Sequence, residues 1–199
     1  MKLIIASNNA HKVREIEQIV GDYFTEMKTL REAGLEIDVV EDGTTFEENA
    51  RKKAVEVLAA APEFDAALAD DSGLIVDALN GAPGVYSARY AGEGHDDAAN
   101  NKKLLEDMDN VPEVLRTCRF ASSIVLARRG MEPITVIGYA EGTLLREPRG
   151  ENGFGYDPLF WYAPLNKTFA ELTADEKNSV SHRSRSLALL KEALEAEKQ

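Results

Sequence analysis

Two patterns of apolar residues alternate along the chain, and together they predict a β-sheet with helices packed on it. Short apolar runs indicate buried strands, and apolar residues three or four positions apart indicate amphipathic helices. The predicted strands are residues 3–6, 66–69, 74–79, 116–129 and 134–142. The predicted helices run from about residue 10, from Thr45 to before Pro62, over 96–108, and near the C-terminus with Leu187, Leu190 and Leu194 on one face. Because the last two strands flank Gly130 as a hairpin, they must be antiparallel, and a mixed-sheet α/β fold is expected.

Two capping boxes mark where helices begin. Thr45 is followed three residues later by Glu48, and Thr173 by Glu176. In such a box the Thr side chain and the Glu side chain each satisfy a backbone N–H that the first helical turn leaves unpaired. Residues 177–183 are predicted to open the last helix behind the second box.

The composition excludes several classes of protein. The 199 residues carry a net charge of −12 at pH 7, so the surface as a whole repels nucleic acid and anionic membranes, and neither is expected as a partner. Cys118 is the only cysteine, which excludes an intrachain disulfide and a thiolate-rich zinc site. The apolar start is too short for a signal peptide and no stretch reaches transmembrane length, so a cytoplasmic location is expected. Without repeats or linker-like segments, residues 1–199 are expected to form one domain.

The most informative feature is a buried strand that runs directly into two carboxylates. Residues 66–69 are small and apolar, and Asp70, Asp71, Ser72 and Gly73 follow at once. Gly73 is expected to form a sharp turn where the chain leaves the sheet. Two side-by-side carboxylates repel unless a cation or proton lies between them, and Mg²⁺ favours such oxygen ligands. A polar turn with two solvated acids is the alternative for this segment taken alone.

Two further segments offer groups for an anion and a metal. The loop at residues 7–12 joins a strand to a helix N-terminus, where backbone N–H groups and Ser7, Asn9 and Lys12 could bind phosphate. It lacks the glycine spacing of a P-loop, and a plain helix cap with a surface lysine is the alternative. Glu41 precedes the second helix and is free to reach a metal, whereas Lys53 could face the same site or solvent.

The C-terminal third contains residues that could bind a nucleotide base. Residues 149–158 interleave glycines with aromatics, so Phe154 or Tyr156 could stack on a base while Asp157 accepts from a base N–H. A loop whose aromatics belong to the core is the alternative. Arg183 can only donate, which suits a carbonyl oxygen, and His182 alone is more often a capping or core residue.

Taken together, these segments resemble the inosine triphosphate pyrophosphatase family. The matching segments are residues 7–12, 43–50, 69–74, 81–90, 153–158 and 176–183. The resemblance implies an elongated mixed sheet with flanking helices, forming two lobes around a central cleft, and a homodimer. It also implies Mg²⁺-dependent hydrolysis of ITP, dITP and XTP to the monophosphate and pyrophosphate.

The resemblance also assigns roles to individual residues. Asp71 would be the general base and would bind the metal with Asp70 and Glu41, although Asp42 is the alternative to Glu41 as the second ligand. The residues that would bind substrate are Ser7, Asn8, Asn9, Ala10, His11, Lys12, Lys53, Ser72, Phe154, Gly155, Tyr156, Asp157, Lys177, His182 and Arg183.

Three other functions compete with this one. A nucleotide sensor without catalysis would need no cluster of metal-binding carboxylates, and a pyrimidine-specific relative would lack the Phe154–Asp157 loop and the Ser181-His182-Arg183 segment. A haloacid-dehalogenase phosphatase would need an Asp-x-Asp loop, which Asp70-Asp71-Ser72 does not provide.

Overall fold

The computed structural model describes residues 1–197, which form an α/β protein with a mixed sheet. The strands in the described part are β1 (Lys2–Ile5), β2 (Glu26–Thr29), β3 (Ala66–Val76), β4 (Thr117–Arg128), β5 (Met131–Leu144), β6 (Phe160–Tyr162) and β7 (Lys167–Thr168). The helices there are α1 (Ala10–Val20), α2 (Phe46–Ala60), α3 (Asp97–Asp107), α4 (Ala174–Val180) and α5 (His182–Ala196). The strand order is β2-β1-β3-β4-β5-β6-β7, so the predicted mixed α/β class is confirmed.

The chain divides into two compact units. The first contains Met1–Asp71, Ser122–Gly138 and the C-terminal segment from Arg183, and the second contains Ser72–Ala121 and Tyr139–His182. The predicted single domain and the predicted central cleft stay predictions.

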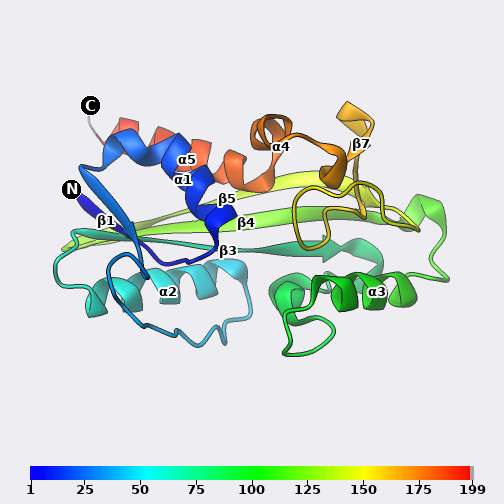
Figure 1. Cartoon of the computed structure of the whole chain (residues 1–199), viewed down its shortest axis with the longest axis horizontal. Helices are drawn as coiled ribbons and strands as arrows, with labels where there is room; N and C mark the ends of the chain where they lie inside the picture. Colours follow the sequence, from blue (N-terminus) through cyan, green and yellow to red (C-terminus); the bar gives the residue numbers. More distant parts are fainter. Residues whose placement is uncertain (198–199) are drawn as a thin grey trace. The chain divides into compact units, whose positions relative to one another are not determined.

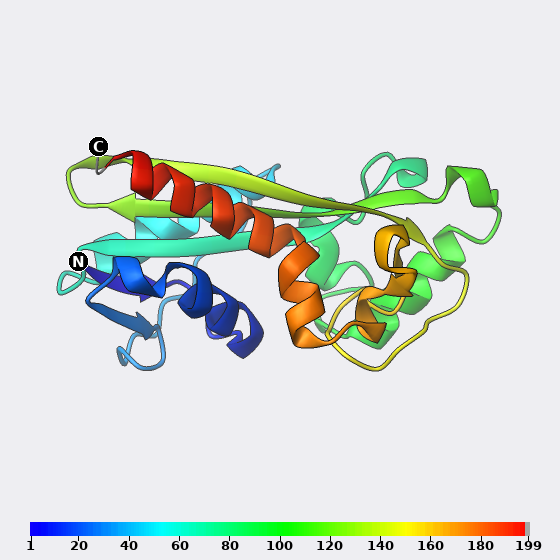
Figure 2. The ribbon, with the colours of Figure 1, turned by 90° about the horizontal axis from the view of Figure 1, so that it is seen from above.

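In the first unit, helices cover both faces of the sheet. Figure 1 shows α1 and α5 on one face and α2 on the other, and Figure 2 shows α1 and α5 side by side. One apolar cluster joins Leu68 to α1 and α5, and a second joins Ala67 and Ala69 to α2. Side chains therefore alternate between the two faces along β3, as they do along any strand.

In the second unit, residues 72–76 of β3, 117–121 of β4 and 139–144 of β5 share a core with α3. Short strands β6 and β7 extend the antiparallel part from β5. Phe120, Phe160 and Phe169 form an aromatic cluster in this core, with ring centroids 4.6 to 5.7 Å apart. The burial of large aromatic side chains makes this cluster a major source of the unit's stability.

Most of the predicted elements are confirmed. Helix α1 begins at the predicted residue, and α2 and α3 begin and end close to the predicted residues. Both capping boxes form, and β4 and β5 are neighbouring strands joined at Arg129-Gly130. Leu187, Leu190 and Leu194 are all buried in the first unit. The sequence analysis did not predict β2, β6 or β7.

Two predictions were wrong. The chain does not leave the sheet at Gly73, because β3 continues through the acidic residues to Val76. A Cβ at Gly73 would lie 2.7 Å from the Gly84 carbonyl oxygen, so glycine permits a close backbone approach there. Residues 177–183 do not open one helix either, because Ser181 has extended backbone angles and separates α4 from α5.

Candidate active site

The loop after β1 lies beside the acidic part of β3 because the two strands are parallel and in register. Ile5 pairs with Leu68, so the residues that follow β1 lie next to those that follow Leu68. The Asn9 side chain then caps α1 by accepting from the backbone N–H groups of His11 (3.0 Å) and Lys12 (3.2 Å). The cap turns the first helical turn back toward β3, where Lys12 Nζ lies 2.6 Å from Asp70 Oδ2. The loop thus combines a helix N-terminus with a lysine, as anion binding requires.

Asp70 faces α1 and α5 and is surrounded by donors. Besides Lys12, its carboxylate accepts from Ser122 Oγ at 2.5 Å and from Arg183 Nε at 3.3 Å. The side chain is buried, which by itself would raise the pKa of this carboxyl. The charges of Lys12 and Arg183 overcome that effect and hold the pKa of Asp70 well below its ordinary value. Asp70 is therefore a permanently ionised partner of two cations.

Asp71 points to the opposite face of β3, toward α2. Its Oδ2 accepts a hydrogen bond of 3.0 Å from Asn49 Nδ2 in the first turns of α2. Burial raises the pKa of Asp71 to about 6, and the nearby Glu41 carboxylate adds to the rise while the Asn49 hydrogen bond opposes it. A carboxyl whose pKa lies close to neutrality is suited to exchange a proton with a reacting group.

The two acids therefore do not form the predicted side-by-side pair. They are consecutive residues of one continuous strand and contact different helices. The expectation of a shared cation rested on a strand that ended at residue 69. In the structure, each carboxylate has its own environment.

Asn49 is a site residue to which sequence analysis gave no role. Its side chain donates to Asp71 and also accepts from the Gly43 backbone N–H at 2.8 Å, so it links the Glu41–Gly43 loop to the carboxylate. Only 1% of Asn49 is exposed. The sequence shows only an asparagine directly after Glu48 of the capping box, and its burial, which requires hydrogen-bond partners, is known from the structure alone.

Asp71 and the nearby Glu41 are the residues on this face that could hold a metal ion. Glu41 and Asp71 influence each other electrostatically, and Lys53 forms an ion pair with Glu41. Within residues 1–197, no three His, Cys, Asp or Glu side chains gather into a group that could hold a metal ion. Mg²⁺ commonly binds one or two carboxylates and fills its other positions with water and phosphate oxygens. Glu41 and Asp71 are two carboxylates of this kind.

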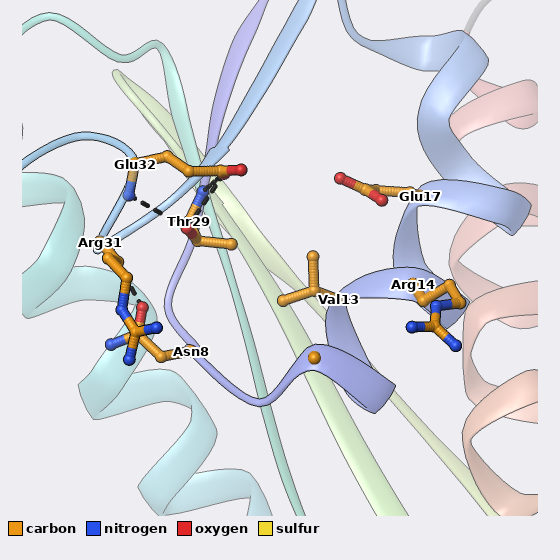
Figure 3. Close-up of a pocket in the computed structure, with 8 residues that line it drawn as sticks. Asn8, Val13, Arg14, Glu17, Thr29, Arg31 and Glu32 are labelled. Carbon is orange, nitrogen blue, oxygen red and sulfur yellow. Dashed lines mark hydrogen bonds between the residues drawn. The ribbon is translucent and has the colours of Figure 1, made fainter.

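Asn8 connects the loop after β1 to the segment that follows β2. Its Oδ1 accepts from the Arg31 backbone N–H at 3.1 Å, and it lines a cavity of about 300 Å³ together with Arg14 and Arg31 (Figure 3). Ala10 lies in the wall of this cavity at the start of α1. Asn8 therefore has a clear structural role in fixing the loop to the segment after β2.

In the second unit, the predicted base-binding loop is held by a buried carboxylate. Asp157 is 2% exposed, accepts from the Phe154 backbone N–H at 2.9 Å and forms an ion pair with Lys177. A Cβ at Gly153, where φ is +78°, would overlap Asp157, so this position requires glycine. Lys177 Nζ lies 4.9 Å from the centre of the half-buried Phe154 ring. Of the two predicted aromatics, Phe154 is half-buried, whereas Tyr156 is buried.

Tyr156 and His182 belong to the core of the second unit, as the alternatives for both segments allowed. The Tyr156 hydroxyl donates to the Ser87 carbonyl oxygen at 2.7 Å, and burial raises the pKa of this phenol. The His182 ring stacks on Phe120 with centroids 4.9 Å apart. Gly155 is fixed by α3, because its N–H donates to Asp97 and its carbonyl accepts from Asn101. Ser72 directly follows Asp71 in β3 and is partly exposed.

Comparisons with known proteins identify the family. A model of the Ham1 family matches residues 3–193. The chain belongs to the Ham1 family. A relative from Clostridium perfringens, described as a dITP/XTP pyrophosphatase, is 52% identical over 97% of both chains. A Bacillus subtilis relative with the same description is 47% identical over 97% of this chain and 96% of its own length.

Solved structures of Ham1 proteins share the fold. The Staphylococcus aureus Ham1 protein matches with a TM-score of 0.88 and 41% identity, covering 99% of this chain and all of that one. A HAM1 protein from Coxiella burnetii matches with a TM-score of 0.89 and 38% identity, covering 98% and 99%. The predicted family is confirmed. No helix within residues 1–197 is long and apolar enough to cross a membrane.

Proposed function

We propose that this Ham1-family protein hydrolyses deaminated purine nucleoside triphosphates, namely ITP, dITP and XTP, to the monophosphate and pyrophosphate with Mg²⁺. The observation that carries the proposal is Asp71, a buried carboxyl whose pKa is raised to about 6, in the same compact unit as the Lys12 loop. The relatives described as dITP/XTP pyrophosphatases support the substrate class. They also confirm the predicted enzyme class of nucleoside triphosphate pyrophosphohydrolase.

The first unit supplies the groups for phosphoryl chemistry. Lys12 and the N–H groups at the start of α1 bind the triphosphate, and Lys53 places a second cation next to Glu41. Asp71 and Glu41 are the residues that would hold Mg²⁺. When bound, this ion neutralises phosphate charge and lowers the pKa of a coordinated water.

Asp71 acts as the general base. Its carboxylate accepts the proton of the attacking water. Asn49 holds one carboxylate oxygen by donating to it, which fixes the orientation of the other. The attack is on the α-phosphorus, and pyrophosphate leaves as one piece.

The predicted base-binding loop at residues 153–157 is assigned to the purine base. Phe154 stacks on the purine and contributes affinity without distinguishing one purine from another. Discrimination against adenine uses donors, because hypoxanthine and xanthine carry a carbonyl at position 6 where adenine carries an amino group. A donor that faces this amino group is left unpaired, which disfavours ATP strongly.

A product assay tests the proposal. Pyrophosphate and orthophosphate release are measured with ITP, XTP, GTP, dTTP and IMP, each with and without Mg²⁺. We expect pyrophosphate from ITP and XTP only when Mg²⁺ is present. Preference for dTTP would indicate a pyrimidine pyrophosphatase, orthophosphate from ITP or IMP a phosphatase, and ITP binding without turnover a nucleotide sensor.

The proposal includes the location and the oligomeric state of the enzyme. An enzyme that cleanses the nucleotide pool acts in the cytoplasm, and we expect it to work as a homodimer. Light scattering on the purified protein measures its mass directly, and a mass near that of one 21.9 kDa chain would contradict the homodimer.

A further inference from the structure

The loop that carries Phe154 is held by the start of α3. Gly155 directly follows Phe154 and has a positive φ of +61°. Its backbone N–H donates to Asp97 Oδ2 at 2.7 Å, and its carbonyl oxygen accepts from Asn101 Nδ2 at 2.8 Å. Asp97 and Asn101 are four residues apart on α3, so they lie on one face of the helix, and all of these residues belong to the second unit. Two side chains of one helix therefore bind both polar groups of one glycine.

These contacts fix the backbone on both sides of Phe154. The N–H of Phe154 donates to Asp157 Oδ2 at 2.9 Å, and the next N–H along the chain, that of Gly155, donates to Asp97. A glycine has many accessible backbone conformations when nothing holds its peptide groups. Because each peptide N–H next to the Phe154 side chain is held by a carboxylate, the backbone directs that side chain one way.

The helix alone does not account for an asparagine at position 101. Asn101 Nδ2 also donates to the Asp97 carbonyl oxygen at 2.9 Å, but Asn101 Oδ1 is buried and has no hydrogen-bond partner within residues 1–197. A buried oxygen without a donor lowers stability, and alanine would favour the helix more than asparagine does. The contact that alanine could not provide is the one with Gly155.

We propose that Asp97 and Asn101 are positioning residues for the purine base: they fix Gly155 so that the Phe154 ring is oriented for stacking before the substrate binds. The inference rests on the proposed function, because it takes Phe154 as the residue that stacks on the base. A ring that is oriented in advance loses less conformational freedom on binding, so the pair adds affinity for the base without touching it.

The test is a double-mutant cycle between Asp97 and Phe154. Asp97→Ala removes the acceptor of the Gly155 N–H, and Phe154→Ala removes the ring through which Asp97 acts. The Kd values for IMP and for inorganic pyrophosphate are measured by calorimetry in Mg²⁺, together with kcat and KM for ITP. Asp97→Asn keeps a side-chain oxygen and is the conservative variant. Glu106→Ala, at an exposed acid of the same helix, is the matched control.

We expect Phe154→Ala to raise the Kd for IMP by about tenfold or more, as the loss of a base–aromatic stack does. Asp97→Ala should raise this Kd and the KM for ITP by about fivefold with kcat unchanged, because uniform binding is lost. In the Phe154→Ala background, Asp97→Ala should add less than about twofold, because the ring that it orients is gone.

The other variants sharpen the expectation. Asp97→Asn and Glu106→Ala should keep the Kd for IMP within about twofold of wild type, since both leave an acceptor for the Gly155 N–H. Pyrophosphate affinity should be unchanged in every variant. Asn101→Asp replaces the donor to Gly155 by an oxygen at nearly constant size and should reproduce the effect of Asp97→Ala. If Asp97→Ala does not fold, Asn101→Asp takes its place in the cycle.

Additive effects of Asp97→Ala and Phe154→Ala on the Kd for IMP would overturn the proposal, because Asp97 would then act independently of the ring. A fall in kcat at unchanged KM would also overturn it, since that pattern indicates a loss of folded protein and not of affinity for the base.

Failure of the proposed function has a different signature. It would appear as wild-type protein that releases no pyrophosphate from ITP, or as an unchanged Kd for IMP in Phe154→Ala. Neither result involves a substitution on α3, so the two failures are distinguishable.

Discussion

The two faces of β3 shift the pKa values of two neighbouring aspartates in opposite directions. On the α1/α5 face, Asp70 is surrounded by Lys12, Arg183 and Ser122, and its pKa is far below the ordinary value. On the α2 face, Asp71 has a neutral amide as its hydrogen-bond donor, and burial raises its pKa to about 6. The residues are adjacent in sequence and both are buried. What differs is the charge of the groups that the flanking helices bring to each face.

This difference separates two roles that one acidic pair is often assumed to share. A carboxylate with a strongly lowered pKa cannot take a proton near neutral pH, but it holds cations in place. A carboxylate whose pKa lies near neutrality can take up a proton in this range. The structure pairs Asp70 with the cations Lys12 and Arg183, and the proposed function uses Asp71 for proton transfer.

The largest effect is expected for Asp71→Asn. This change keeps the size of the side chain but removes the proton acceptor, so turnover of ITP should fall by a factor on the order of 10² or more. The measurement is steady-state pyrophosphate release at saturating Mg²⁺. Asp38→Asn, an exposed acid of the same unit, is the control and should retain wild-type turnover. Near wild-type turnover in Asp71→Asn would remove this residue from the mechanism.

The second prediction concerns stability and pH in the presence of a chelator. Because the pKa of Asp71 is raised from 3.8 to about 6, the folded state holds its proton more tightly than the unfolded state. The stabilisation from this group is fully present below about pH 4 and is lost as pH rises through 6. At about 1.4 kcal/mol per pKa unit, the loss approaches roughly 3 kcal/mol.

Asp70 should behave in the opposite way. Its lowered pKa contributes stability above about pH 4 that is lost as the pH falls. Urea unfolding of wild type and Asp71→Asn at pH 4.5 and 7.5 separates the two groups. As the pH rises from 4.5 to 7.5, the free energy of unfolding of the wild-type protein should fall relative to that of the variant. An equal change in both proteins would contradict the raised pKa.

The sequence predicted the elements that local signals specify. Capping boxes located the starts of α2 and α4, although α4 was expected to continue as the last helix, and the hairpin followed from Gly130. Strands β2, β6 and β7 have two to four residues each and depend on their neighbours in the sheet, so no local pattern marks them. The break at Ser181 was missed because the capping box and the leucines at 187, 190 and 194 fit one uninterrupted helix.

The roles of the candidate site residues stay predictions, and only their arrangement is given by the structure. The structure brings Lys12, Asp70 and Asp71 together in the first unit, with Glu41 and Lys53 beside them. The ion pairs of Arg183 and the core positions of Tyr156 and His182 depend on which helix covers which face, and a linear motif does not encode that. Asn49 was missed for the same reason.

The third prediction decides between Glu41 and Asp42 as the second metal ligand on the α2 face. Glu41 acts on the pKa of Asp71 and pairs with the partly buried Lys53, whereas Asp42 pairs with Lys52 and its side chain is 68% exposed. Glu41→Gln should raise the Mg²⁺ concentration needed for half-maximal activity by about tenfold or more. Asp42→Asn is the matched variant and should change it by less than about twofold. The reverse result would assign the metal to Asp42.

The smallest effect compares two adjacent serines of β4 that face the two sides of the sheet. Ser122 Oγ donates to the ionised Asp70 at 2.5 Å, whereas Ser123 Oγ is buried and has no hydrogen-bond partner within residues 1–197. A hydrogen bond to a charged group contributes about 1.5 to 3 kcal/mol, and a buried hydroxyl without a partner contributes nothing of this kind. Ser122→Ala should therefore lower the free energy of unfolding by about 2 kcal/mol, and Ser123→Ala should leave it unchanged or raise it slightly. Urea titration at pH 7.5 measures both, and because each variant loses one buried hydroxyl, the pair controls for the cavity. Equal destabilisation by both variants would show that the hydrogen bond from Ser122 to the charged Asp70 contributes no more than the unpaired hydroxyl of Ser123.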